Sequence, residues 1–263
     1  MTPDTARMIG LVDLTRLEST DTDDLQEAEA IQTLCRRAGS DFGPVAAICV
    51  HPGWIALADR ELRAAGLRDA VGLATVANFP AGTASIEDTV AEIKAAIDDG
   101  ADEIDVVLPW QELLDGRIEA VQQLLAASRM ACSNHGMKVI LETGELAEPD
   151  LIRQAADLAI ACGADFLKTS TGKVPVNATL AAATILLEAI RDSGRDVGFK
   201  ASGGIRAASE AAAYLTLARQ MMGEDWVDAQ HLRFGASSLL DDLLAQAQEQ
   251  AEAPAHGQDS AQQ

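Results

Sequence analysis

The sequence predicts one α/β domain folded as a (β/α)8 barrel of the TIM type, and three observations support this fold class. Eight short apolar runs alternate with longer segments of helical periodicity along the 263 residues. Within these runs apolar and polar residues do not alternate strictly, which is typical of parallel strands buried on both faces. Eight such units in about 250 residues match the size of a TIM barrel. A doubly wound sheet is the alternative, but no G-x-G-x-x-G turn follows any of the runs.

The predicted strands follow one another at regular intervals, and a predicted helix comes after each. They cover residues 8–14, 45–50, 70–76, 103–108, 138–142, 166–169, 197–200 and 232–235. Residues at the predicted helix ends are of the expected kinds. Ser85 is a candidate N-cap before an acidic first turn, and Pro149 suits the first position of a helix. Gly100 and Gly163 are candidate C-terminal glycines that lead into strands.

Composition and chain organisation indicate one domain. Hydrophobic residues make up 48% of the chain but aromatic residues only 3%, so the core must consist mainly of Ala, Leu, Ile and Val. No linker or change in composition separates a second domain. We therefore expect the barrel to occupy residues 1–248 and a polar, disordered tail to occupy residues 249–263.

The net charge of −21 excludes several classes of partner. A field of this sign repels phosphate backbones and anionic lipid, so we expect neither nucleic acid nor a membrane surface as a partner. An anionic substrate would require a local positive site built against that field. The sequence leaves the oligomeric state open, and a homo-oligomer is compatible with it.

The cysteines predict neither a metal site nor a disulfide framework. They are Cys35, Cys49, Cys132 and Cys162, which form no C-x-x-C pair and have no run of histidines nearby. Widely spaced cysteines of this kind are typical of reduced core thiols in a cytosolic protein. Residues 1–8 lack a signal-peptide pattern, and no apolar run approaches the ~18 residues of a membrane helix. We expect a cytoplasmic protein.

The placement of lysines gives the first indication of chemistry. Only five of the 20 basic side chains are lysines, and Lys168 and Lys200 end the predicted sixth and seventh strands. Neighbouring strands lie ~4.8 Å apart, and barrel enzymes carry their active sites at this end. Two inward ammonium groups repel each other, so we expect one amine to be neutral and nucleophilic, as a Schiff-base lysine requires. Either lysine alone could instead form an ion pair or extend to solvent.

Asp105 is the third candidate catalytic residue because it lies within the predicted fourth strand with apolar residues on both sides. A buried carboxylate is costly unless it is paired, so one of the lysines is its expected partner, directly or through water. Proton transfer and a purely structural counter-ion are both open interpretations. Asp13 on the first predicted strand and Glu142 on the fifth are weaker candidates, which could also serve to cap or orient their neighbours.

Three loops of small residues, after the sixth, seventh and eighth predicted strands, indicate a phosphate site. Loops at these positions form the usual phosphate site of barrels, where free N–H groups meet a helix N-terminus. The candidate residues are Thr171, Gly172, Lys173, Gly203, Gly204, Gly235, Ser237 and Ser238. The segment is not a P-loop, because Leu167 replaces its first glycine and Val174 its Ser/Thr. No pattern for a metal or an organic cofactor accompanies these loops.

Across most of its length the sequence resembles deoxyribose-phosphate aldolase, in its longer bacterial form. The segments that carry the resemblance are NFP at 78–80, GADEIDVVLP at 100–109, LETGEL at 141–146, GADFLKTSTGK at 163–173, GFKASGGIR at 198–206 and FGASSL at 234–239. The resemblance implies a lyase of the class I (Schiff-base) type that works without metal or cofactor. It implies reversible cleavage of 2-deoxy-D-ribose 5-phosphate to acetaldehyde and D-glyceraldehyde 3-phosphate, in deoxyribonucleoside catabolism.

The resemblance also implies roles for single residues. Lys168 of KTSTGK would form the Schiff base, Lys200 of FKASGG would perturb it, and Asp105 of EIDVV would move protons. Lys173, Gly204 and the pair Ser237 and Ser238 would hold the hydroxyl and phosphate groups of the substrate, a phosphorylated sugar.

Two departures from the family pattern limit what can be carried over. Some long-form members have proline where this chain has Ala201, and some end in a tyrosine that this chain lacks, its only tyrosine being Tyr214. Two other readings stay open: a Schiff-base aldolase for another sugar phosphate, and a catalytically silent phosphate-binding barrel. The second fits less well because phosphate binding alone needs none of Lys168, Lys200 and Asp105.

Overall fold

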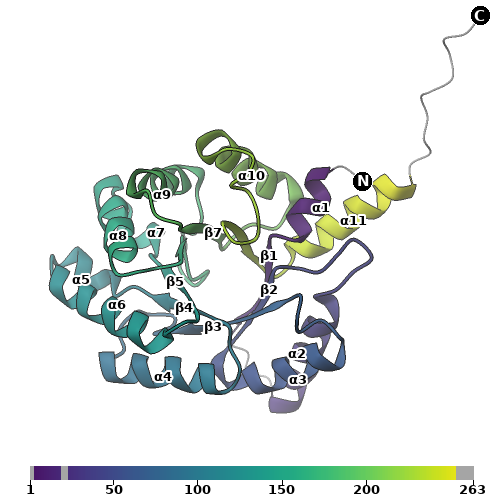
Figure 1. Cartoon of the computed structure of the whole chain (residues 1–263), viewed down its shortest axis with the longest axis horizontal. Helices are drawn as coiled ribbons and strands as arrows, with labels where there is room; N and C mark the ends of the chain where they lie inside the picture. The colour runs from purple at the N-terminus through teal and green to yellow at the C-terminus, as the bar shows by residue number, and fades with distance from the viewer. Residues whose placement is uncertain (1–2, 19–22, 253–263) are drawn as a thin grey trace, which may run out of the picture.

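The computed structural model describes residues 3–18 and 23–252 and shows a closed barrel of eight parallel strands (Figure 1). Each strand pairs with the next in chain order, and the eighth pairs with the first. The strands are β1 (Val12–Arg16), β2 (Ala47–Val50), β3 (Gly72–Ala77), β4 (Glu103–Val107), β5 (Gly136–Ile140), β6 (Phe166–Lys168), β7 (Gly198–Ser202) and β8 (Leu232–Ala236). The predicted fold class, a single (β/α)8 barrel, is confirmed.

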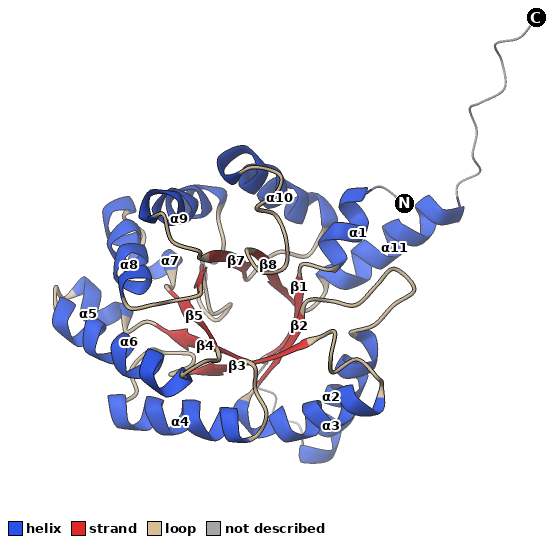
Figure 2. Cartoon of the chain, in the orientation of Figure 1, coloured by secondary structure: helices blue, strands red, loops and turns tan. Residues whose placement is uncertain are grey.

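Helices surround the strands as an outer ring (Figure 2). They are α1 (Pro3–Ile9), α2 (Asp24–Arg37), the 3-10 helix η1 (Pro52–Trp54), α3 (Ile55–Ala64), α4 (Ile86–Asp98), α5 (Trp110–Leu114), α6 (Ile118–Cys132), α7 (Thr143–Leu146), α8 (Pro149–Ala161), α9 (Leu180–Ser193), α10 (Ala208–Met222) and α11 (Leu239–Glu252). Apolar side chains between this ring and the strands form the main core. Within the described ranges, no helix is both long and apolar enough to cross a membrane.

The helix ends follow the sequence prediction. The Ser85 hydroxyl accepts the N–H of Asp88 at 3.0 Å and caps α4, and Pro149 is the first residue of α8. Gly100 and Gly163 follow α4 and α8 with φ of 107° and 86°, which favour glycine.

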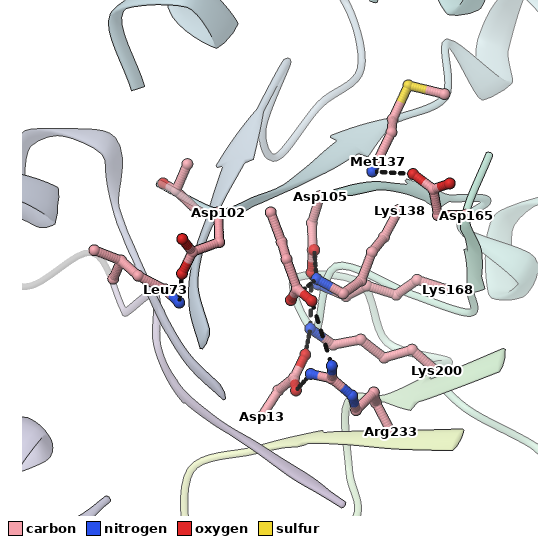
Figure 3. Close-up of polar contacts among 12 residues, drawn as sticks. Asp13, Leu73, Asp102, Asp105, Met137, Lys138, Asp165, Lys168, Lys200 and Arg233 are labelled. Carbon is pink, nitrogen blue, oxygen red and sulfur yellow. Dashed lines mark hydrogen bonds and ion pairs between the residues drawn. The ribbon is translucent and has the colours of Figure 1, made fainter. Parts of the chain in front are cut away.

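Two G-A-D segments fix the beginnings of neighbouring strands in the same way. Asp102 accepts the N–H of Leu73 at 2.7 Å, and Asp165 accepts the N–H of Met137 at 2.7 Å (Figure 3). Each aspartate precedes one strand and accepts the N–H of the second residue of the neighbouring strand. Such contacts fix the register on which the interior of the barrel depends.

The first predicted strand requires a correction. Residues 8–14 were expected to be extended, but α1 runs to Ile9 and β1 begins at Val12. Met8 and Ile9 are buried at the end of the helix. The apolar run thus joins the buried face of a short helix to a strand, and periodicity alone does not separate the two.

Two further boundaries differ from the prediction. Strand β5 ends at Ile140, so Glu142 is not part of it; this residue precedes α7 with a left-handed φ of 55°. Helix α11 continues to Glu252, so residues 249–252 are helical, not part of a disordered tail. Residues 253–263 lie outside the described residues. The leucines of α11 lie in its first half, and its last residues are polar and mostly exposed, so the sequence there has the composition of a tail.

Register places several charged side chains inside the barrel. Partners in a parallel pair point to the same side of the sheet, and Asp105 is paired with Lys138, Lys168 with Lys200, and Lys200 with Arg233. All five side chains are almost fully buried. The interior of the barrel therefore contains charged side chains, whereas the core between the strands and the helices is apolar.

Candidate active site

Seven charged side chains from six strands meet in the barrel interior. They are Asp13 from β1, Glu103 and Asp105 from β4, Lys138 from β5, Lys168 from β6, Lys200 from β7 and Arg233 from β8. Figure 3 shows the side chains of Lys138, Lys168 and Lys200 converging on Asp105. Buried charges persist only when paired, and every member of this set has an oppositely charged partner.

Asp105 is the centre of the network. Its Oδ2 accepts hydrogen bonds from Lys168 Nζ at 2.9 Å and Lys200 Nζ at 2.8 Å, and its Oδ1 accepts one from Lys138 Nζ at 2.9 Å. Burial works against the ionised carboxylate, but the three lysines outweigh burial and hold the pKa of Asp105 well below its usual value. The structure thus pairs Asp105 with both predicted lysines and with a third.

Lys168 and Lys200 have unequal surroundings. Burial, the largest influence, and the charge of Lys200 together lower the pKa of Lys168, although Asp105 opposes them. For Lys200 burial acts in the same sense, but Asp105 and Asp13 outweigh it and raise the pKa. Of the two amines, Lys168 is therefore the one that loses its proton more readily. Repulsion between the lysines contributes as expected from the sequence, but burial is the larger cause.

An open pocket of about 200 Å³ lies at the carboxyl end of the barrel. It brings together the loops after β6, β7 and β8, and all eight candidate phosphate residues line it: Thr171, Gly172, Lys173, Gly203, Gly204, Gly235, Ser237 and Ser238. Gly235 joins this pocket to the amines, because a Cβ there would lie 2.7 Å from the Ser202 hydroxyl and 3.0 Å from Lys200 Cε. Any side chain at this point would crowd the Ser202 hydroxyl and the end of Lys200.

The pocket presents donors that no residue in the described part of the chain uses. Among the described residues, the backbone N–H groups of Gly203, Gly204, Ser237 and Ser238 have no acceptor, and Lys173 has no ion-pair partner. The pocket walls also include the guanidinium-bearing side chain of Arg206. Free amides and unpaired cations suit an anion such as phosphate.

Glu142 organises the loop that carries Lys173. Its two carboxylate oxygens accept the N–H of Thr171 at 3.2 Å and the hydroxyl of Thr171. The same hydroxyl oxygen accepts the N–H of Lys173 at 3.1 Å. Burial raises the pKa of Glu142. Of the two roles considered for Glu142, the contacts support orienting its neighbours.

A small apolar cluster lies near the amines and reaches the pocket through Leu17. It consists of Leu17, Cys49, Ala74, Val76 and Phe79. Burial raises the pKa of the Cys49 thiol to about 11, and the nearby charges of Asp105, Lys200 and Lys168 also act on it. The cluster gives the interior one wall of carbon and neutral sulfur next to Lys168.

Sequence reasoning missed four contributors to this region. Lys138, Glu103 and Arg233 belong to the buried network, and Arg206 lines the pocket. Lys138 carried a detectable signal, because it is one of only five lysines and lies within a predicted strand. Tyr214 lies in α10 and packs in the core. Within residues 3–18 and 23–252, no group of three or more His, Cys, Asp or Glu side chains is arranged to hold a metal ion.

The fold and this site define a class of protein: a barrel with a buried lysine suited to act as an amine nucleophile, as in the Schiff-base aldolases. Comparison with known families agrees. Residues 7–245 match the family described as DeoC/LacD family aldolase, and the chain belongs to this family.

Solved structures with the same architecture include three that cover nearly the whole chain. A protein from Coccidioides immitis, proposed to be a deoxyribose-phosphate aldolase, is 28% identical over 93% of this chain and 87% of its own, with a TM-score of 0.79. A deoxyribose phosphate aldolase from Aeropyrum pernix, described as a unique tetramer, is 25% identical over 94% and 93%, with a TM-score of 0.74. A Toxoplasma gondii protein of 22% identity, covering 95% and 96%, shares the fold with a TM-score of 0.84.

Proposed function

We propose that this aldolase cleaves 2-deoxy-D-ribose 5-phosphate reversibly to acetaldehyde and D-glyceraldehyde 3-phosphate through a Schiff base on Lys168. One observation carries the proposal: the buried Lys168 amine shares Asp105 Oδ2 with Lys200, beside a pocket of unused anion donors. The names of the structural relatives from Coccidioides immitis and Aeropyrum pernix support the same activity.

The reaction follows from a neutral amine. Lys168 Nζ attacks the C1 aldehyde of the open-chain sugar, and the carbinolamine loses water to give an iminium ion. The C2–C3 bond then breaks: its electron pair moves toward the iminium, and the 3-hydroxyl loses its proton as C3 becomes the aldehyde of glyceraldehyde 3-phosphate. Protonation of the remaining enamine at C2 and hydrolysis of the imine release acetaldehyde and regenerate Lys168.

Asp105 and Lys200 serve as the proton-moving pair. Lys200 stays protonated, and its positive charge disfavours protonation of Lys168. It also places a proton donor 2.8 Å from Asp105 Oδ2. Asp105 accepts hydrogen bonds from both amines through one oxygen, so a proton can pass between the carbinolamine and Lys200 with little movement. A water bound between the pair and the substrate would complete this path.

The two walls of the site support a phosphorylated 2-deoxy sugar. The free amides of Gly204 and Ser238, with Lys173, suit the phosphate at one end. Near the amines, the apolar cluster of Cys49 and its neighbours would offer no strong partner to a 2-hydroxyl, which would lose its hydrogen bonds to water on binding. A methylene at C2 avoids that loss.

Borohydride trapping tests the reaction and names the lysine. The protein is incubated with acetaldehyde, reduced, digested and analysed by mass spectrometry. We expect a two-carbon adduct on Lys168 and, in a separate assay, release of acetaldehyde from 2-deoxyribose 5-phosphate. Trapping with dihydroxyacetone phosphate or pyruvate instead of acetaldehyde would assign the enzyme to a different sugar phosphate. Absence of any adduct and of any cleavage would support a silent phosphate-binding barrel and overturn the proposal.

The proposal extends to the setting of the enzyme. The buried free thiols of Cys35, Cys49 and Cys132 suit a reducing compartment, which supports a cytoplasmic enzyme of deoxyribonucleoside breakdown. The tetramer described for the Aeropyrum pernix relative supports a homo-oligomer. Cell fractionation and light scattering after size-exclusion chromatography test these two points; secretion or a monomer at working concentration would contradict them.

A further inference from the structure

Six of the seven interior charges form a closed ring in which acids and bases alternate. Its contacts are Asp105 Oδ1 to Lys138 Nζ at 2.9 Å, Lys138 Nζ to Glu103 Oε2 at 2.6 Å, Glu103 Oε1 to Arg233 Nη2 at 3.3 Å, Arg233 Nη1 to Asp13 Oδ1 at 2.7 Å, Asp13 Oδ2 to Lys200 Nζ at 2.5 Å and Lys200 Nζ to Asp105 Oδ2 at 2.8 Å. We call these six residues the charge ring. Three carboxylates face three cations, so the ring is neutral.

Lys168 is the seventh group and lies outside the ring. It contacts the ring through Asp105 Oδ2 alone, and that oxygen already accepts from Lys200. A proton on Lys168 would therefore add a charge that no carboxylate of the ring is left to balance. In a buried site such an excess is costly, so the composition of the ring decides how readily Lys168 is protonated.

We propose that Lys138 and Glu103, which have no place in the chemistry proposed above, are positioning residues that keep the ring neutral and hold Asp105 so that Lys168 remains the uncharged nucleophile. The proposal rests on the function proposed above and deepens it. Lys138 Nζ holds Oδ1 of Asp105 and so turns Oδ2 toward the two other lysines. Glu103 balances Lys138 from the far side, with its side chain 18% exposed at the start of β4.

Four other titratable groups lie close enough to act on Lys168: Asp105 on β4, Lys200 on β7, the Cys49 thiol on β2 and Glu142 after β5. All four are still present when Lys138 or Glu103 is replaced. A change in Lys168 protonation on such a replacement would therefore reflect the charge of the ring and its hold on Asp105.

The signs of the expected effects differ between the two residues. Lys138→Met leaves the ring with one excess negative charge, which favours a protonated Lys168. Glu103→Gln leaves one excess positive charge, which disfavours it. The double variant Lys138→Met/Glu103→Gln restores a neutral ring, so its effect should be far smaller than that of Lys138→Met alone. A purely structural role would make the double variant the worst of the three.

The protein's small number of lysines allows a direct test without substrate. Lysine labelled with ¹³C at Cε gives five signals in the full chain, and loss of one in Lys168→Arg assigns Lys168. We expect its titration midpoint to rise by roughly one pH unit in Lys138→Met, to fall in Glu103→Gln and to return close to the wild-type value in the double variant. Lys94→Met, an exposed lysine on α4, is the matched control and should leave the midpoint unchanged.

The outcomes separate this proposal from the proposed function. Equal midpoints in all variants, or shifts of the same sign in Lys138→Met and Glu103→Gln, would overturn the role of the ring even if wild-type protein traps acetaldehyde on Lys168. Ring-dependent shifts in a protein that traps no aldehyde would overturn the aldolase function alone. Circular dichroism of each variant shows whether it is folded. If Lys138→Met does not fold, the single variant Lys138→Gln and the double variant Lys138→Gln/Glu103→Gln allow the same comparison.

Discussion

Lys168 and Lys200 donate to the same carboxylate oxygen, Oδ2 of Asp105, at 2.9 and 2.8 Å. Lys200 also contacts Asp13 at 2.5 Å, whereas no second carboxylate pairs with Lys168 among the residues that the structure describes. Lys168 and Lys200 are in register on neighbouring strands, but within the described part of the chain Lys200 has two carboxylate partners and Lys168 has one. That difference favours the charge on Lys200 and supports Lys168 as the nucleophile that we propose.

The covalent role of Lys168 is tested by a change that keeps a long basic side chain but removes the primary amine. Lys168→Arg should abolish cleavage of 2-deoxyribose 5-phosphate, because a guanidinium stays protonated and forms no imine. The arginine carries a permanent charge beside a ring that is already neutral, so the variant should unfold at a lower temperature than the wild type. Mass spectrometry after borohydride reduction checks the assignment with Lys168→Ala: a two-carbon adduct at one other lysine of that variant would move the Schiff base elsewhere.

The second prediction concerns pH. Lys200 lowers the pKa of Lys168, so Lys200→Leu should raise it. Since the reaction needs a neutral Lys168, the acidic limb of the kcat/KM profile should move to higher pH. At the wild-type optimum kcat should fall by about 10²-fold or more, because a placed proton donor is lost as well. A profile measured from pH 5 to 10 that keeps its acidic limb in place would refute the electrostatic link between the two lysines.

The third prediction distinguishes two properties of Glu142: its hydrogen bonds to Thr171 and its strained backbone conformation. Glu142→Ala removes the acceptor that holds Thr171, so the turn carrying Lys173 should loosen and KM should rise. Glu142→Gly removes the same acceptor but suits the positive φ of 55°. Chemical denaturation should therefore find the glycine variant more stable than the alanine variant by about 1 kcal/mol. The two variants should share the same KM; a lower KM for one of them would contradict the positional role.

The fold was predictable from sequence because its signals are local. The apolar runs around Val106 and Leu167 are short and separated by helical segments, and each later strand was predicted within a few residues. The exception was residues 8–14, where Met8 at the end of a buried helix adjoins the strand that begins at Val12. A continuous apolar stretch carries no mark of where one element ends.

The site was predictable only in part, for a different physical reason. Lys168 and Lys200 were found because they end neighbouring strands in a chain with only five lysines, and Asp105 because a buried carboxylate is costly without a partner. Lys138 and Arg233 are equally buried, but their function depends on which residues face them across the sheet. Register is a property of the folded barrel, not of any one segment. Consequently the closed ring of alternating charge could be seen only in the structure.

The last prediction concerns phosphate recognition. A protein of net charge −21 repels a dianion at long range, so binding must come from short-range donors in the pocket, whose contacts are little screened. Ser238 lines the pocket just before α11, and its N–H has no acceptor among the residues described. Ser238→Asp would place a carboxylate among these donors, where it would satisfy them and repel the phosphate.

Ser238→Asp should therefore raise KM for 2-deoxyribose 5-phosphate by roughly tenfold or more, which corresponds to about 1.4 kcal/mol of lost binding. Unphosphorylated 2-deoxyribose has no group at this position, so its kcat/KM should stay the same or rise. Ser238→Ala is the matched control, because it removes the hydroxyl without adding charge and keeps the backbone N–H; its effect should be small. Steady-state kinetics with both sugars decide the point. Equal losses on both would mean that the phosphate binds elsewhere, since only its own binding depends on these donors.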